Sequence, residues 1–75
     1  MLQSVFLEEL QELLQRDTPI KPDMALADMA EWDSLAVMSC ILYFDKNFKV
    51  PTTIAQYKTM RTVSDLIALS NGAIT

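Results

Sequence analysis

Apolar residues recur at intervals of three and four in two long stretches of the chain, and this spacing constrains the fold more than any other feature. The first stretch, residues 2–14, has Leu2, Phe6, Leu10 and Leu13 on one face and Gln and Glu on the other. The second stretch, residues 35–48, has Val37, Ile41, Phe44 and Phe48, with Cys40 on their flank. A period near 3.6 predicts two amphipathic helices, and no alternating run predicts a strand. The sequence therefore predicts an all-α fold.

The segment between these helices, residues 17–33, shows no helical period. Pro19 and Pro22 prevent a regular helix at its start. A long irregular segment in so small a protein is typically functional or mobile. Apolar residues are spread along this segment, and we expect their side chains to pack on the core as anchors. This favours an ordered loop with a short helical turn inside it. These anchors are Ile20, Leu26, Met29 and Trp32.

Capping signals locate the remaining helices. Ser34 is a suitable N-cap for the second helix, and Thr52 or Thr53 can cap a short third helix. Residues 62–65, Thr-Val-Ser-Asp, resemble a capping box and predict a fourth helix that stops at Asn71-Gly72.

A chain of 75 residues has room for a single small core. The prediction is one domain over residues 1–75: a small four-helix bundle of monomeric form, with a long loop between helices 1 and 2 and a short helix 3. The sequence contains no histidine and only one cysteine, Cys40. These counts exclude a Ser-His-Asp triad, Cys-His chemistry, a disulfide within the chain and a zinc site of the usual type. An enzyme is not expected.

The charge of the chain is unevenly distributed. Residues 1–34 contain eight acidic and two basic residues, a net charge of −6, whereas residues 35–75 have a net charge of +2. Nucleic acid is not an expected partner, because phosphate binding requires a basic patch. A basic protein surface is the better match for the acidic half.

The sequence does not predict a membrane-spanning segment or a secretory signal. The apolar run from Leu35 to Phe44 is too short for a membrane span. A secretory signal begins with basic residues followed by an apolar block, whereas this N-terminal region carries Glu8, Glu9 and Glu12 among its leucines. With a single cysteine, the expected location is the cytoplasm.

Leu35, Met38 and Leu42 form a second apolar stripe beside the core stripe of residues 35–48, with Ser34 at its top. A bundle this small can hardly bury both stripes. This stripe therefore predicts a docking face for another protein, with the serine at its edge. A broad core stripe or a dimer seam is the alternative use of Met38 and Leu42.

The Asp33-Ser34-Leu35 sequence at the start of the second helix, between a long loop and a short third helix, resembles that of acyl carrier proteins. The resemblance covers nearly the whole chain. It implies that Ser34 receives 4′-phosphopantetheine from coenzyme A through a separate phosphopantetheinyl transferase, and that acyl groups are carried as thioesters on this arm. It also implies that Asp33 is recognised by the transferase and that Leu35, Met38 and Leu42 contact partner enzymes.

Several residues depart from carriers of fatty-acid synthesis. Trp32 precedes Asp33, Ser39 and Lys46 stand where acids are common, and Asp45 is the only acid between residues 35 and 50. The chain resembles instead stand-alone "WDSL" carriers of specialised pathways, which are served by a dedicated acyl-loading ligase or acyltransferase and a downstream synthase. The alternatives are a D-alanyl or other aminoacyl carrier, a peptidyl carrier, and an unmodified helical interaction module.

Each of these residues also has a purely structural interpretation. In this interpretation, Ser34 is a helix cap and nothing more, and Asp33 is only a partner of the helix dipole. Trp32 is predicted to plug the core beneath the loop, with a contact to the arm as the alternative. Cys40 is predicted to be a small buried apolar residue without a redox role.

Overall fold

A computed structural model describes residues 1–75, and its regular elements are all helical. Their bounds are α1 Gln3–Leu13, η1 (a 3₁₀ turn) Leu26–Asp28, α2 Ser34–Phe48, α3 Ile54–Lys58 and α4 Val63–Ala68. The only β-type pairing is one isolated antiparallel bridge between Ala25 and Thr62. The all-α prediction with four helices, a long first loop and a short third helix is confirmed. No helix has both the length and the apolar content required to cross a membrane.

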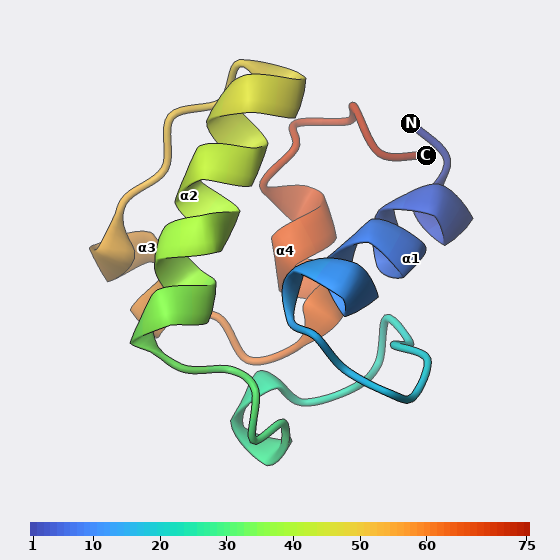
Figure 1. The fold of residues 1–75 in the computed structure, drawn as a ribbon. Helices are drawn as coiled ribbons and strands as arrows, with labels where there is room; N and C mark the ends of the chain where they lie inside the picture. Colours follow the sequence, from blue (N-terminus) through green and yellow to red (C-terminus); the bar gives the residue numbers. More distant parts are fainter.

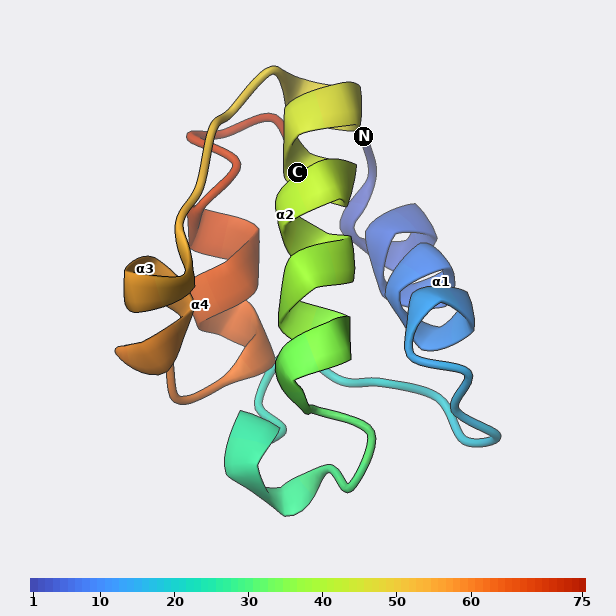
Figure 2. The ribbon, with the colours of Figure 1, turned by 60° about the vertical axis from the view of Figure 1, so that its left-hand side comes forward.

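Helix α2 is the central element of the bundle. Helices α1 and α3 lie on opposite sides of it, and the loop that contains η1 closes the end of the bundle at which α2 begins (Figures 1 and 2). The two termini meet near the start of α1 (Figure 1), where the backbone N–H of Thr75 donates to the carbonyl of Met1 at 2.8 Å.

The core joins α1 to α2 through aromatic side chains. The ring centroids of Phe6 and Phe44 are 6.0 Å apart, and those of Phe44 and Phe48 are 5.3 Å apart. At the edge of this cluster, the Tyr43 hydroxyl donates a 2.8 Å hydrogen bond to the Glu9 carboxylate. The largest fully buried side chains are Phe6, Phe44, Leu26, Leu66, Val63 and Cys40.

The face of α2 that enters the core differs from the prediction. Ala36, Cys40 and Phe44 are its buried residues, whereas Val37, Ile41 and Phe48 are only partly buried and pack around them. Cys40 is 1% exposed and lies in the middle of the buried face rather than on its flank. The apolar residues of α2 cover more than half of its circumference, so their spacing alone does not fix which of them point inward.

The loop between α1 and α2 is ordered, as predicted, and is held to the start of α4. The backbone N–H of Leu26 donates to the carbonyl of Arg61 at 2.8 Å, and that of Val63 donates to the carbonyl of Met24 at 3.1 Å. The predicted anchors Ile20, Leu26 and Met29 are buried. The loop therefore forms one wall of the core.

Helix α4 is shorter than predicted. It ends at Ala68, and turns continue to Asn71 and Gly72, whose φ angles of 55° and 93° are left-handed. This reversal returns the chain to the core, where Ile74 is buried. The Asn-Gly pair thus reverses the chain three residues after the helix, rather than ending the helix itself.

Candidate functional site

Ser34 is the first residue of α2 and not its N-cap, so the capping prediction is wrong. Asp33 precedes the helix with extended backbone angles, φ −124° and ψ −173°, and its Oδ1 accepts a 2.9 Å hydrogen bond from the backbone N–H of Ala36. Aspartate and serine are comparable caps, so two adjacent candidates leave the helix start ambiguous by one residue. Because Asp33 supplies the cap, the Ser34 hydroxyl has no part in holding the helix start.

The chain contains five serines, and their surroundings differ. The Ser64 hydroxyl donates to the carbonyl of Pro22 at 2.9 Å, and the buried Ser70 hydroxyl donates to the carbonyl of Ile67 at 2.8 Å. Ser4 and Ser39 lie within helices. Ser34 is exposed at the start of α2 and lines a cavity that none of the other serines reaches.

The segment immediately before Ser34 is held in place from two directions. Arg16 Nη1, just beyond the end of α1, donates to Glu31 Oε1 at 3.0 Å. The backbone N–H of Trp32 donates to the carbonyl of Met29 at 3.0 Å, and Met29 itself is buried. The approach of the chain to α2 is therefore fixed both by α1 and by the core.

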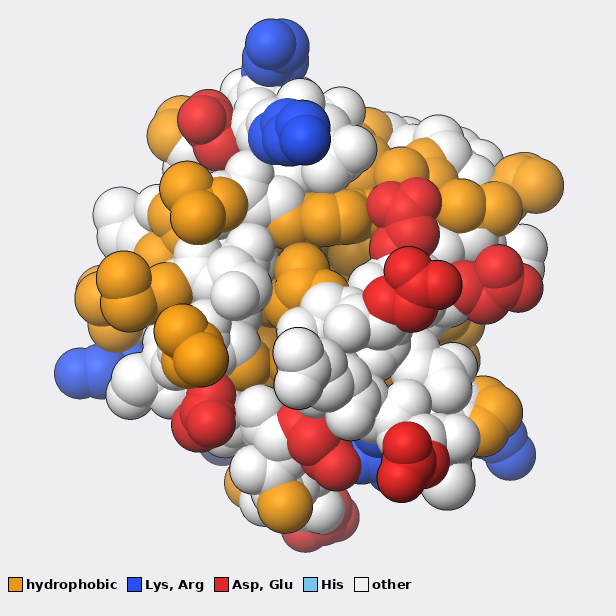
Figure 3. Space-filling model, viewed as in Figure 1, with side chains coloured by type: hydrophobic (Ala, Val, Ile, Leu, Met, Phe, Trp, Pro, Cys, Tyr) orange, Lys and Arg blue, Asp and Glu red, His pale blue; other side chains and the backbone are white.

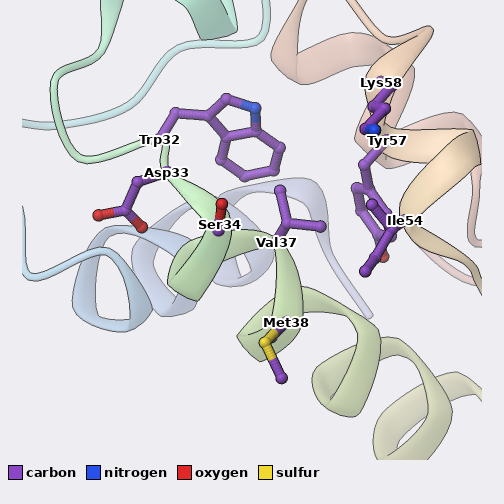
Figure 4. A pocket seen from close by; sticks show the side chains of 8 residues that line it. All are labelled: Trp32, Asp33, Ser34, Val37, Met38, Ile54, Tyr57 and Lys58. Carbon is purple, nitrogen blue, oxygen red and sulfur yellow. The ribbon is translucent and has the colours of Figure 1, made fainter.

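A cavity of about 360 Å³ opens beside Ser34, between α2 and α3. Figure 4 shows Trp32 above Ser34 and Val37, with Tyr57, Ile54 and Lys58 across from them on α3. The lining residues are Trp32, Asp33, Ser34, Val37, Met38, Ile54, Tyr57 and Lys58. Five of these eight residues are hydrophobic. An apolar group bound close to Ser34 can therefore be shielded from water inside this cavity.

Trp32 contributes both to the core and to the wall of the cavity. It is partly buried and packs against the core, and its ring centroid lies 6.3 Å from that of Tyr57. The same ring forms part of the cavity wall. The predicted packing of Trp32 against the core is therefore confirmed, although the loop leaves one side of the indole facing the cavity. A contact between Trp32 and the arm stays a prediction.

The second stripe of α2 faces solvent. Leu35, Met38 and Leu42 are 72%, 56% and 71% exposed. Hydrophobic side chains run down the α2 side of the molecule in Figure 3, whereas the acidic side chains gather over α1 and the loop end. Ile54 at the start of α3 is 52% exposed and adds a further apolar group. Met38 and Leu42 are thus not part of the core.

The residues around Ser34 provide no base for its hydroxyl. The Asp33 carboxylate is directed away from Ser34 and from the cavity (Figure 4), and its Oδ1 is occupied by the helix cap. Burial raises the pKa of Tyr57, which keeps its hydroxyl protonated beside Thr52 Oγ1 at 2.9 Å. No group of three or more acidic or thiol side chains is arranged to hold a metal ion. Reaction at Ser34 Oγ therefore needs a base supplied from outside.

The sequence matches the family described as "Phosphopantetheine attachment site" over residues 4–70. The chain belongs to this family. It is a phosphopantetheine-bearing carrier, and the predicted resemblance to acyl carrier proteins is confirmed. The group that such a domain carries is 4′-phosphopantetheine, attached covalently to a serine. Neither a curated protein nor a solved structure matches the chain.

The α3 side of the carrier's cavity was missed in the sequence. Ile54, Tyr57 and Lys58 stand at three- and four-residue spacing, which places them on one face of a helix. That spacing could have indicated that these three side chains share one face. It could not indicate that this face borders the cavity, because the packing of α3 beside the start of α2 is a tertiary contact that the local pattern does not encode.

Proposed function

We propose that this carrier holds an acyl group as a thioester on a 4′-phosphopantetheine arm attached to Ser34, and delivers it to partner enzymes of a specialised biosynthetic pathway. The observation that carries this proposal is the position of Ser34. It is the exposed serine at the start of α2, it is free of any capping role, and it borders the cavity.

The surroundings of Ser34 fit attachment by a separate transferase. Attachment joins Ser34 Oγ to the pantetheine-bearing phosphorus of coenzyme A, the bond to the adenosine bisphosphate breaks, and a base of the transferase takes the hydroxyl proton. Asp33 offers a carboxylate next to Ser34 for a cationic site of that enzyme. The attached arm supplies a terminal thiol for the thioester.

The cavity supports an apolar cargo over an aminoacyl one. An ammonium group placed between Val37 and Tyr57 would lose its hydration without gaining a carboxylate partner, because the Asp33 carboxylate is directed away from the cavity (Figure 4). Lys58, the cation at the cavity wall, would also repel it.

Partner enzymes are proposed to dock on Leu35, Met38 and Leu42, which are exposed and contiguous with Ser34 along α2. These partners are an acyl-loading ligase or acyltransferase and a downstream synthase. A role outside general fatty-acid synthesis is supported by the composition of α2, where Asp45 is the only acid and Lys46 follows it.

The test is the intact mass of the purified protein after incubation with coenzyme A, magnesium and a broad-specificity phosphopantetheinyl transferase. We expect one added arm on the wild type and on Ser4→Ala, which changes another exposed helical serine, and none on Ser34→Ala. Because Asp33 caps α2, Ser34→Ala is expected to remain folded, with stability within about 0.5 kcal/mol of wild type. An arm on Ser34→Ala, or none on the wild type with several transferases, would contradict the proposal.

A further inference from the structure

The wall of the cavity beside Ser34 contains a buried polar group that the proposed function does not use. Tyr57 is 2% exposed, and its hydroxyl lies 2.9 Å from Oγ1 of Thr52, which is also buried. In Figure 4, the hydroxyl end of Tyr57 points toward Ile54, another residue of the wall. Buried hydroxyl groups are almost always hydrogen-bonded, so the partners of this one can be counted.

The hydroxyls of Tyr57 and Thr52 carry two hydrogens but share one hydrogen bond, in which either oxygen can be the donor. Neither hydroxyl has a second partner in the protein, so one O–H hydrogen is left without an acceptor. Burial raises the pKa of Tyr57, so its hydroxyl keeps the proton and remains a donor. A buried donor without an acceptor destabilises the fold. Because Tyr57 lines the cavity, a molecule in the cavity can supply the missing acceptor.

We propose that Tyr57 donates a hydrogen bond to an oxygen atom of the carried acyl group, so that the cavity takes a chain bearing a keto oxygen in preference to a plain alkyl chain. Thr52 then donates to Tyr57 and Tyr57 donates to the cargo, which gives both hydrogens an acceptor. This inference rests on the proposed function, since the acyl group reaches the cavity on an arm attached to Ser34.

The rest of the wall fits the remainder of such a chain. Val37, Met38 and Ile54 present apolar atoms to its methylene groups. The Asp33 carboxylate is directed away from the cavity and does not compete for the Tyr57 hydrogen (Figure 4). A keto oxygen only accepts, so it brings no hydrogen that would itself need a partner in this apolar space.

The same hydrogen discriminates against a plain alkyl chain. Such a chain covers Tyr57 without offering an acceptor, and a site with a buried polar group disfavours a ligand that leaves this group unpaired. The amide carbonyls of the arm offer the same chemistry as a keto group. Experiments must therefore compare the bare arm, an alkyl cargo and a keto cargo.

The first experiment observes the tyrosines directly. The chain contains only Tyr43 and Tyr57, so protein labelled with ¹³C at tyrosine Cζ gives two signals, which respond to hydrogen bonding of the phenol oxygen. A broad-specificity transferase attaches the bare arm, the octanoyl arm, or the 3-, 5- or 7-oxooctanoyl arm from the matching coenzyme A derivative. The three isomers place the oxygen at different depths. We expect the Tyr57 signal of at least one oxooctanoyl form to shift from its position in the octanoyl form. The signal of Tyr43, whose hydroxyl donates to Glu9 outside the cavity, should stay in place.

The second experiment removes the hydroxyl. Tyr57→Phe keeps the ring that lies beside Trp32, and Tyr43→Phe is the matched control. In urea unfolding, Tyr57→Phe should lower the ratio of folded to unfolded protein about tenfold more in the shifted oxooctanoyl form than in the octanoyl form. Tyr43→Phe should lower this ratio by the same factor in both forms. Comparing two cargoes within each variant cancels the loss of the Thr52 contact, which both forms share.

The inference is overturned if the Tyr57 signal is the same in the octanoyl form and in all three oxooctanoyl forms, or if Tyr57→Phe affects the two acyl forms equally. A Tyr57 signal that already reaches its shifted position with the bare arm also overturns it, because the acceptor is then an amide of the arm. If Tyr57→Phe does not fold, the signals of the wild type decide the question. A wild-type protein that takes no arm at all would instead contradict the proposed attachment at Ser34.

Discussion

Asp33 joins two roles that substitution can separate. Its carboxylate caps α2 through the backbone N–H of Ala36 at 2.9 Å, and it also puts a negative charge beside Ser34. Asparagine retains an acceptor for the cap but has no charge, whereas alanine has neither. Asp33→Ala should therefore lower the free energy of unfolding by about 1 kcal/mol, and Asp33→Asn by less. Both should lower kcat/KM for arm transfer, because both lack the charge that the transferase is proposed to recognise.

Urea unfolding and mass-spectrometric transfer rates, measured on the same preparations, separate the two roles of Asp33. If Asp33→Asn is modified at the wild-type rate, the carboxylate serves the helix alone and recognition by charge is ruled out.

Cys40 is buried in α2, and burial raises the pKa of its thiol to about 12. Alkylating reagents react with the thiolate, so the folded protein without the arm should take up no label at mildly alkaline pH. The unfolded protein should take up one label, because Cys40 is the only cysteine. The arm ends in an exposed thiol, so the modified protein should take up one label while folded. Intact mass gives these counts, and labelling of the folded protein before arm transfer would show that α2 opens.

At the scale of single elements, the ends of the helices are the least regular part of the fold. Lys49, immediately after α2, has a left-handed φ of 58°, and its backbone N–H donates to the carbonyl of Asp45. Left-handed backbone costs roughly 1–2 kcal/mol in a residue with a Cβ. We therefore expect Lys49→Gly to stabilise the protein by up to about 1 kcal/mol.

The matched control for Lys49→Gly is Lys46→Gly, the same change at an exposed position inside α2. There glycine should destabilise by about 1 kcal/mol. Urea midpoints of the two variants should thus move in opposite directions from the wild type. A decrease in both would mean that the left-handed turn is not strained.

Helix α4 begins with a carboxylate that makes its stability depend on pH. Asp65 Oδ2 accepts hydrogen bonds from the backbone N–H groups of Arg61 at 2.8 Å and Thr62 at 3.1 Å, and these bonds lower the pKa of Asp65. The charged form is favoured in the folded state. Its contribution to stability is therefore complete above the ordinary pKa of aspartate, near 4, and is lost as the pH falls through the lower folded-state pKa.

In Asp65→Asn, the loss of stability at acid pH should be smaller than in the wild type, since the asparagine side chain does not titrate. We expect wild type and Asp65→Asn to differ most in urea midpoint near neutral pH and to converge at acid pH. Asp45→Asn, on an exposed carboxylate that makes no side-chain hydrogen bond, provides the control and should leave the acid-side decrease in place. Parallel curves for wild type and Asp65→Asn would contradict the assigned role.

The helices could be predicted from the sequence because their signals are local. The capping box of α4 and the Thr53 cap of α3 depend on residues within three positions of each other. The start and the buried face of α2 were not fixed by such signals. Asp33 and Ser34 are both good caps, and the apolar residues of α2 exceed the width of one face, so core packing around Cys40 decides which residues point inward.

At the scale of the whole molecule, the cavity beside Ser34 arises from contacts between elements that are distant in sequence. The exposure of Ser34 and of the stripe Leu35, Met38 and Leu42 was predictable because all four residues lie on α2. The cavity was not, because its walls come from Trp32 in the loop and from Ile54 and Tyr57 on α3. A sequence pattern can indicate that α3 is amphipathic, but its neighbour follows only from the packing of the bundle.

The cavity predicts that the fold of the carrier responds to the length of its cargo. An octanoyl chain placed in the cavity removes methylene groups from water, each worth about 0.8 kcal/mol when fully buried, whereas an acetyl group is too short to gain as much. The octanoyl form should therefore unfold at a higher urea concentration than the acetyl form.

The fluorescence of Trp32 should report entry of the acyl chain into the cavity, because Trp32 is the only tryptophan and lines the cavity. Its fluorescence emission should move to shorter wavelength in the octanoyl form, as apolar carbons displace water from the exposed side of the ring. The control is free octanoyl-pantetheine added to Ser34→Ala, which lacks the covalent link and should leave the emission unchanged at equal concentration. Equal urea midpoints and equal emission for the two acyl forms would mean that the cargo stays in solvent. The space between α2 and α3 would then serve partner enzymes and not the cargo, because a covalently held octanoyl chain samples the cavity at high effective concentration.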